Sequence, residues 1–448
     1  MTNIDIYPYG QNAEMPDGYP IADDLTTNSA RKALSARQGV RLKEMMSEVQ
    51  KSKMPTLLTM GEPTNIIYTI DEFLLAHEYD PSNSVDNLKF STDLGKTWIT
   101  KENTFGVLTN AFRFADGTFM MCCRQSDGMH FLWSRDFDTF NDCTVYDYNG
   151  NTYQTRANDR RGYMNRQKCY HTYYKGTEYY LFEDYVFPDS NSASSNPRLW
   201  YALSEDSGVT IRCAFAFGLS QIGGVTIPAR HVHSFVYNSY DGYFYAMTGD
   251  HGADECNVMR GTLGDNNTWT WERMAHGQKY KVMSPVFDEG NIYLITDYTD
   301  ASLVNAKGIV GVPLDRFDFD NFTYLFHATA SFMLEGSISS SQPAAMTHMV
   351  TDNHGWRFMI TDYIGNSKHM IAKGDHNFVW VDNTTGLKFE RIFGPNAKGD
   401  VYVSTKVPSS SVPEETLRIS GKQTYNLTEA MRNSGATDFF DGYNGMPY

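Results

Sequence analysis

The chain has 448 residues, a formal net charge of −15 and an aromatic content of 14%. This length allows two or three ordinary domains or one large repeat domain, and the many Tyr and Phe residues suit short strands better than long helices. The acidic charge argues against binding to nucleic acid or to an anionic membrane surface. We expect no membrane insertion and no signal peptide, because no long apolar run is present and no basic segment precedes one near the N-terminus.

The first region, residues 1–54, is polar and then becomes helical in pattern. Ser35 and Gln38 have capping-box spacing, so the sequence predicts a helix over 35–53. One side of this helix is apolar, through Leu42, Met45, Met46 and Val49. Such a stripe either packs on the following domain or meets copies of itself in a short coiled coil, which would make the protein a homo-oligomer.

Part of this region resembles a segment of bacteriophage tail fibres. The matching residues are Leu25-Thr26-Thr27 and the run 33–39, Ala-Leu-Ser-Ala-Arg-Gln-Gly. The resemblance implies an attachment segment that precedes a receptor-facing domain. It therefore implies a phage or prophage tail protein that is made in the bacterial cytoplasm, is incorporated into the virion tail and contacts other tail subunits. The six cysteines, which form no C-x-x-C pair, fit folding in a cytosol as free thiols.

The second region, about 55–407, repeats an apolar strand that follows a polar turn and ends in polar residues. The unit recurs about every 54 residues. The repeated strands are 73–78, 118–124, 179–184, 243–250, 292–297, 356–362 and 401–405. A four-stranded propeller blade takes about 40–50 residues, so the pattern predicts a mainly β protein with a β-propeller of seven blades, or alternatively six. The last blade would take its outer strands from 417–420 and 423–427, leaving the propeller at 55–427 and a C-terminal tail at 428–448.

Two segments share the pattern S-x-D-x-G-x-T followed by a large apolar residue. They start at Ser91 and Ser204. In a tight hairpin the Asp carboxylate accepts hydrogen bonds from backbone N–H groups, and the Gly takes a positive φ. The pattern resembles the Asp-box of sialidase-like (BNR-repeat) β-propellers. The resemblance implies structural roles for Ser91, Asp93, Gly95, Trp98, Ser204, Asp206 and Gly208.

In a propeller, the ends of the second strands and the starts of the innermost strands meet at one mouth of the ring. The second strands end in His77, Glu78, Arg124, Glu183, Asp184, Tyr185, Asp250, His251, Asp297, Tyr298, Asp362 and Tyr363. The innermost strands contribute His171, Arg230, His231 and His233. The predicted ligand-binding residues of this mouth are His171, Arg230, His231, His233, Asp297, Tyr298, Asp362 and Tyr363.

Three functions are possible for the residues of this mouth: catalysis, metal binding and sugar binding. By analogy with sialidases, Glu183, Tyr185, Asp250 and Arg124 could act as catalytic groups of a glycoside hydrolase or lyase. The family's first arginine motif is missing, however, because residues 105–108 read Phe-Gly-Val-Leu. His231, His233 and Asp250 could instead hold a divalent metal, although hydrogen-bonded strand histidines are the more common arrangement and no cofactor is expected. The third possibility is sugar binding without chemistry.

The sequence thus predicts a phage tail-associated propeller that binds host-surface carbohydrate. A polysaccharide-cleaving enzyme and a purely structural tail subunit are the alternatives. A basic cluster at Arg156, Arg160, Arg161 and Arg166 is either a solvated loop or a contact for an anionic glycan or another subunit.

Overall fold

A computed structural model shows two compact units, residues 1–54 and 55–448. The residues that it describes are 21–22, 33–34, 65–80, 85–125, 128–153, 163–164, 170–185, 196–249, 252–287, 290–296, 308–313, 323–327, 345–351, 356–362, 368–373, 377–381, 388–394, 396, 399–406 and 423–426. In the first unit, β1 (Ile21–Ala22) pairs in parallel with β2 (Ala33–Leu34). The predicted helix 35–53 and the tail 428–448 lie outside the described residues.

The described part of the second unit contains seven sheets of three to six strands, numbered here in chain order. The first sheet is β3 (Asn65–Ile70), β4 (Phe73–Asp80), β5 (Val85–Ser91) and β6 (Ile99–Glu102), and the second is β7 (Val107–Arg113), β8 (Phe119–Gln125), β9 (Gly128–Ser134) and β10 (Asn141–Asp142). The third is β13 (Tyr170–Tyr174), β14 (Thr177–Tyr185), β15 (Arg198–Glu205) and β16 (Gly208–Ala216), with β11 (Thr144–Tyr146) and β12 (Tyr163–Met164) added at its edges. The fourth is β19 (His231–Asn238), β20 (Tyr243–Gly249), β21 (Asn257–Leu263) and β22 (Trp269–His276).

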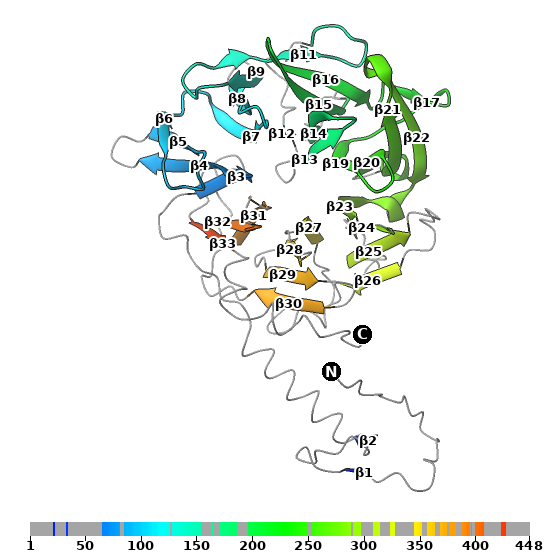
Figure 1. Cartoon of the computed structure of the whole chain (residues 1–448). Coiled ribbons are helices and arrows are strands. Elements are labelled where there is room, and N and C mark those ends of the chain that lie inside the picture. The colour runs from blue at the N-terminus through cyan, green and yellow to red at the C-terminus, as the bar shows by residue number, and fades with distance from the viewer. Residues whose placement is uncertain are drawn as a thin grey trace. The chain divides into compact units, whose positions relative to one another are not determined.

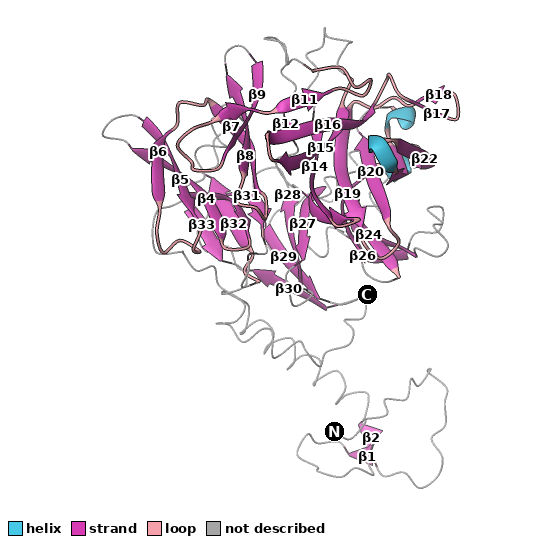
Figure 2. Cartoon of the chain, turned by 45° about the horizontal axis from the view of Figure 1, so that its top comes forward, coloured by secondary structure: helices cyan, strands magenta, loops and turns pink. Residues whose placement is uncertain are grey.

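The remaining sheets follow the same order. The fifth is β23 (Val282–Phe287), β24 (Asn291–Thr296), β25 (Gly308–Pro313) and β26 (Thr323–His327). The sixth is β27 (Ala345–Thr351), β28 (Trp356–Asp362), β29 (Lys368–Lys373) and β30 (Asn377–Val381), and the seventh is β31 (Lys388–Phe393), β32 (Tyr402–Lys406) and β33 (Gln423–Asn426). A small hairpin, β17 (Gln221–Ile222) and β18 (Val225–Thr226), and three 3-10 turns, η1 (Ala253–Glu255), η2 (Asp265–Asn267) and η3 (Gln278–Tyr280), complete the described elements, in which strands predominate (Figure 2).

These sheets have the arrangement of a β-propeller. Within each sheet, successive strands pair antiparallel in chain order, apart from the added edge strands of the third sheet. The first strand of one sheet lies against the next sheet, as β3 does against β7 and β19 against β23. The first strand β3 also contacts the seventh sheet through β31 and β32, so the sheets of this unit follow one another around a ring (Figure 1). The protein is therefore mainly β, as predicted.

The seven strands that the repeat predicted are all observed as the second strands of these sheets. Where the described core clusters resolve it, both faces of such a strand pack against neighbouring sheets, which is why the sequence shows continuous apolar runs rather than simple alternation. In β8, for example, Phe119, Met121 and Cys123 pack toward the first sheet, whereas Met120 and Cys122 pack toward the third. The core therefore lies between adjacent sheets. No helix within the described ranges has the length and apolar character needed to span a bilayer.

The first predicted Asp-box forms the turn between β5 and β6. The Asp93 carboxylate accepts the backbone N–H of Thr97 at 2.9 Å and the Thr97 hydroxyl at 2.7 Å. The Ser91 hydroxyl accepts the N–H of Gly95 at 2.8 Å, and Gly95 has a φ of 84°. Trp98 then packs on the cluster between the first and seventh sheets. Asp93 and its hydroxyl and amide donors thus define this turn.

The second predicted Asp-box has different hydrogen bonds. Ser204 donates to Asp116 of the second sheet at 2.6 Å, and Thr210 donates to Glu205, while the Asp206 side chain is exposed. β15 and β16 are joined by only two residues, a shorter connection than the one that Asp93 spans, so the turn role of Asp206 stays a prediction. Gly208 keeps a positive φ of 132°, and an added Cβ there would lie 2.7 Å from the Trp133 ring.

A box-like turn that the sequence pattern missed lies between β9 and β10. Asp136 accepts the N–H groups of Asp138 and Thr139, both at 2.8 Å, and the Ser134 hydroxyl accepts the N–H of Phe137 at 2.9 Å. Phe137 itself has a φ of 58° and is buried between the first and second sheets. The turn has no glycine, so the S-x-D-x-G pattern did not detect it.

Replacing Asp93 by asparagine should destabilise the protein in a pH-dependent way. The hydrogen bonds from Thr97 lower the pKa of Asp93 from its ordinary 3.8 to about 2. A pKa that is lower in the folded state stabilises the fold fully above about pH 4, and this contribution is lost as the pH falls toward about 2. Thermal unfolding midpoints of wild type and Asp93→Asn should therefore differ at neutral pH and converge in acid.

The matched control for this prediction is Asp206→Asn, at the corresponding position of the second motif. We expect it to have the wild-type midpoint at every pH, since the Asp206 side chain is exposed in a two-residue hairpin. An equal decrease of the unfolding midpoint in the two variants would show that the hydrogen bonds of Asp93 in its turn do not specifically stabilise the fold.

Candidate functional site

The end of β14 places two acidic side chains of the predicted mouth on opposite faces of the third sheet. Glu183 shares its face with Tyr179 and Leu181, which pack toward the fourth sheet, and it is completely buried. Asp184 is on the face that packs toward the second sheet. Its carboxylate accepts the indole N–H of Trp200 at 2.8 Å and the backbone N–H of Arg198 at 3.1 Å, so its contacts here are structural.

Arg198 and Asp147 form a largely buried ion pair in the described part of the chain. Arg198 Nε and Nη2 donate to the two carboxylate oxygens of Asp147 at 2.7 and 3.1 Å, and Nη1 donates to the Asn196 carbonyl. The guanidinium stacks over Tyr153, 4.9 Å from the ring centre. Burial alone would lower the pKa of Arg198, but the bond to Asp147 and the charge of Asp184 outweigh burial and hold it above its usual value. This pair ties the connection after β11 to the third sheet.

The histidines of the fourth sheet are buried rather than open to the mouth. His231 pairs in register with Gly249, and a bulge between Val232 and Ser234 interrupts the strict alternation that was expected for His231 and His233. His233 Nδ1 lies 3.2 Å from the carbonyl oxygen of Val282 in the next sheet. Arg230, just before β19, is half-buried.

No group of three or more His, Cys, Asp or Glu side chains that could hold a metal occurs among the residues that the structure describes. Asp250 lies outside those residues, so a metal site of His231, His233 and Asp250 stays a prediction.

The other predicted mouth residues are placed only in part. Arg124, Tyr185 and Asp362 belong to β8, β14 and β28 by their backbones, and His77 belongs to β4. Glu78 binds Lys89 at 2.7 Å. The residues outside the described part of the chain are Asp250, His251, Asp297, Tyr298 and Tyr363. The catalytic assignment of Glu183, Tyr185, Asp250 and Arg124 therefore stays a prediction.

His171 belongs to a different group of side chains, which we call the His171 cluster: His171, Tyr173 and Glu178. His171 Nε2 lies 2.6 Å from Glu178 Oε1. The His171 ring stacks on Tyr180 at 4.9 Å and meets the Tyr173 ring edge-to-face at 5.1 Å. Because Tyr173 pairs in register with Glu178 next to the Lys175-Gly176 turn, the cluster lies at the hairpin end of β13 and β14, away from Glu183.

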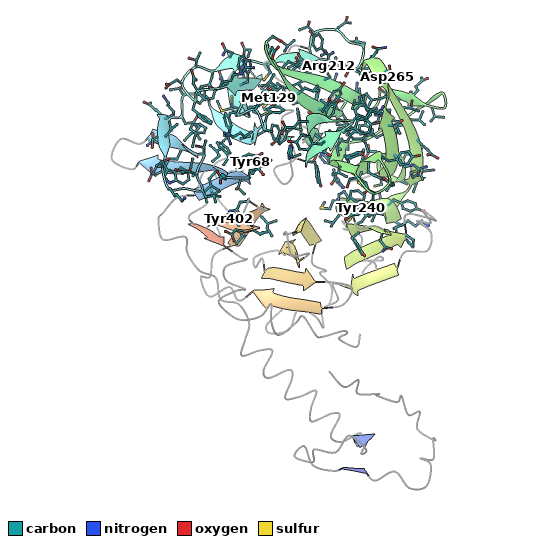
Figure 3. The ribbon with its side chains drawn as sticks, in the orientation of Figure 1. Tyr68, Met129, Arg212, Tyr240, Asp265 and Tyr402 are labelled. Carbon is teal, nitrogen blue, oxygen red and sulfur yellow. The ribbon has the colours of Figure 1, made fainter. Side chains whose placement is uncertain are left out.

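Three sheets meet at the His171 cluster. The N–H of Ala115, in the β7–β8 turn of the second sheet, donates to both Glu178 oxygens at 3.0 and 2.9 Å. Tyr68 of the first sheet lies on the innermost strand β3, with its hydroxyl 3.5 Å from that of Tyr180 (Figure 3). Burial raises the pKa of Tyr173, and the negative charges of Glu178 and Asp71 raise it further, so Asp71 of the β3–β4 turn is also near.

Sequence reasoning identified His171 but missed Glu178 and Tyr173. The signal was present: in a two-residue hairpin, residues equally far from the turn face each other, so Tyr173 and Glu178, one position beyond the residues that flank Lys175-Gly176, could have been paired from the turn alone. The contact with Ala115 had no such signal, because 63 residues separate it from Glu178.

No family model matches the chain, and no curated protein matches it. Among solved structures, an acylaminoacyl peptidase in complex with Z-Gly-Gly-Phe-chloromethyl ketone is 7% identical, with a TM-score of 0.43, over 80% of this chain and 50% of that chain. The β-propeller domain of the trilobed protease from Pyrococcus furiosus is 7% identical, with a TM-score of 0.45, over 77% and 92% of the two chains. A post-proline cleaving enzyme from Rickettsia typhi is 9% identical, with a TM-score of 0.43, over 81% and 52%. The chain thus spans about half the length of the two peptidases, and at these TM-scores the likenesses carry no conclusion about function.

Proposed function

We propose that the chain is a tail-associated protein of a bacteriophage or prophage, in which a seven-bladed β-propeller binds host-surface carbohydrate. The tail-fibre-like segment at residues 23–46 supports the location in a virion tail, where residues 35–53 would join copies of the chain and other tail subunits. The turn held by Asp93, which resembles a sialidase-like Asp-box, supports a propeller of the BNR type.

One observation carries the carbohydrate-binding role: an exposed aromatic ring beside a fixed polar pair at the inner edge of the ring of sheets. Tyr173 is 55% exposed and adjoins the His171–Glu178 pair. Sugar rings stack on aromatic faces through their C–H groups, while their hydroxyls require fixed donors and acceptors. The His171 cluster offers both.

Glu183 favours the alternative role, cleavage of a surface polysaccharide as a hydrolase or lyase. A completely buried carboxyl group near a predicted mouth is the kind of group whose protonation an enzyme uses. Its neighbour Asp184, however, accepts the indole N–H of Trp200 and the backbone N–H of Arg198, so this second carboxylate has a structural role. We therefore prefer the binding function.

The test is to apply the fluorescently labelled full chain to an array of bacterial surface polysaccharides and their oligosaccharides. We expect saturable binding to a subset at micromolar protein, with no release of new reducing ends in solution. Release of reducing ends that Glu183→Gln abolishes would establish the enzyme instead. The absence of both binding and cleavage would leave a purely structural tail subunit.

A further inference from the structure

We infer that His171, Tyr173 and Glu178 form a subsite for a neutral or N-acetylated sugar ring, located on the face of the propeller that carries the turns between first and second strands. This inference rests on the proposed function and gives it a position and a ligand class. The position differs from the mouth at which the sequence placed its catalytic candidates.

The stacking surface is Tyr173, which is exposed although it belongs to the innermost strand of its sheet, β13. Its ring makes an edge-to-face contact with His171 at 5.1 Å, which helps to fix its orientation. An aromatic side chain that is 55% exposed on an innermost strand leaves apolar area in water. A sugar that stacks there would bury this area.

The polar part of the subsite is preorganised. Glu178 accepts the Ala115 N–H through both oxygens and lies 2.6 Å from His171 Nε2, so its carboxylate is fixed from two sides. With Nε2 directed at Glu178, the other ring nitrogen, Nδ1, is the one that a ligand hydroxyl or amide would meet. Stacking of His171 on Tyr180 holds the plane of the imidazole ring. Such fixed groups lower the entropy cost of binding.

The charges near Tyr173 determine which sugars fit. Glu178 and Asp71 both place negative charge near the phenol ring. The nearest cation in sequence, Lys175, has its ammonium group over the Tyr174 ring at 5.3 Å. Tyr174 contacts Tyr237 of the fourth sheet, so this ring faces away from the second sheet. Uronic acids and sialic acids would meet like charge at the subsite, whereas neutral hexoses and N-acetylhexosamines would not.

A matched tyrosine provides the control. Tyr240 is also 55% exposed and lies in the β19–β20 turn of the fourth sheet (Figure 3). Its backbone N–H donates to the side chain of Asn238. It therefore matches Tyr173 in exposure but belongs to a different turn. Removing Tyr240 therefore tests whether any exposed tyrosine on this face is sufficient.

The experiment measures binding of the full-length wild type, Tyr173→Ala, Tyr173→Phe, His171→Gln and Tyr240→Ala to two probe sets: neutral and N-acetylhexosamine oligosaccharides, and sialylated and uronate-containing ones. We expect the wild type to prefer the first set. Tyr173→Ala should weaken binding by about tenfold or more, whereas Tyr173→Phe and Tyr240→Ala should bind as the wild type does. His171→Gln should weaken binding less than Tyr173→Ala. The thermal unfolding midpoint of each variant is compared with that of the wild type to check that the variant is folded.

Unchanged affinity in Tyr173→Ala, an equal loss in Tyr240→Ala, or a preference for acidic sugars would each overturn the subsite while leaving the binding function in place. If the wild type binds neither probe set nor any surface polysaccharide, the proposed function fails, and the subsite fails with it.

Discussion

Replacing Asp147 by alanine should lower the free energy of unfolding by about 3–5 kcal/mol, because it leaves a buried guanidinium without its carboxylate. The Arg198 side chain is only 6% exposed and that of Asp147 only 16%, so the guanidinium is largely shielded from water. The backbone of Arg198 would still bond Asp184, which confines the damage to the guanidinium. Urea unfolding of the full chain, followed by tryptophan fluorescence, measures the loss.

Two further variants test the cause of this loss. Glu272→Ala removes the partner of Arg260, but Glu272 is 61% exposed, so we expect a loss below about 1 kcal/mol. The double variant Asp147→Leu/Arg198→Met replaces the pair by apolar groups and should recover part of the stability, since it leaves no unpaired guanidinium and Asp184 keeps its bonds from Trp200 and from the backbone N–H of residue 198. If Asp147→Ala costs no more than Glu272→Ala, the ion pair does not stabilise the third sheet.

Replacing Gly249 by alanine should destabilise the fourth sheet by about 1–3 kcal/mol through overpacking. A Cβ at this position would lie 2.2 Å from Cε1 of His233, far inside contact distance. The imidazole cannot simply rotate away, because it is 2% exposed and its Nδ1 faces the Val282 carbonyl. The measurement is again the unfolding free energy in urea.

Gly252 provides the comparison for Gly249. It has a φ of −93°, and the closest atom to an added Cβ is 3.4 Å away in the flexible Glu255 side chain, so Gly252→Ala should be nearly neutral. Combining Gly249→Ala with His233→Ala should cost less than the sum of the single changes, since the clash is then gone. Additive losses would show that His233 is not what excludes a side chain at position 249.

Much of the fold could be predicted from the sequence because strands buried on both faces leave a strong local signal. The run Phe119–Cys123 is entirely apolar, follows an Asp-Gly turn and recurs in equivalent form along the chain. Turns were harder to predict. The Asp136 turn lacks glycine, and the Ser204 motif matched the pattern but bonds to Asp116 in another sheet, so pattern alone neither found all such turns nor assigned their contacts.

The candidate site could be predicted less well because its contacts join distant parts of the chain. Glu178 is fixed by Ala115, and Tyr180 lies beside Tyr68, which is 112 residues away in sequence. Alternation predicted a common side for His231 and His233, but the bulge after Val232 changes the spacing there. A sequence period indicates that strands meet in a ring, but it does not show which side chains meet across neighbouring sheets.

The most direct test of a carbohydrate-binding propeller is a calorimetric titration of the full chain with the neutral oligosaccharide that gives the strongest array signal, with reducing ends assayed in the same sample. We predict saturable binding without cleavage, largely lost in Tyr173→Ala and retained in Tyr240→Ala. Absence of saturable heat, or binding that is accompanied by release of reducing ends, would contradict it.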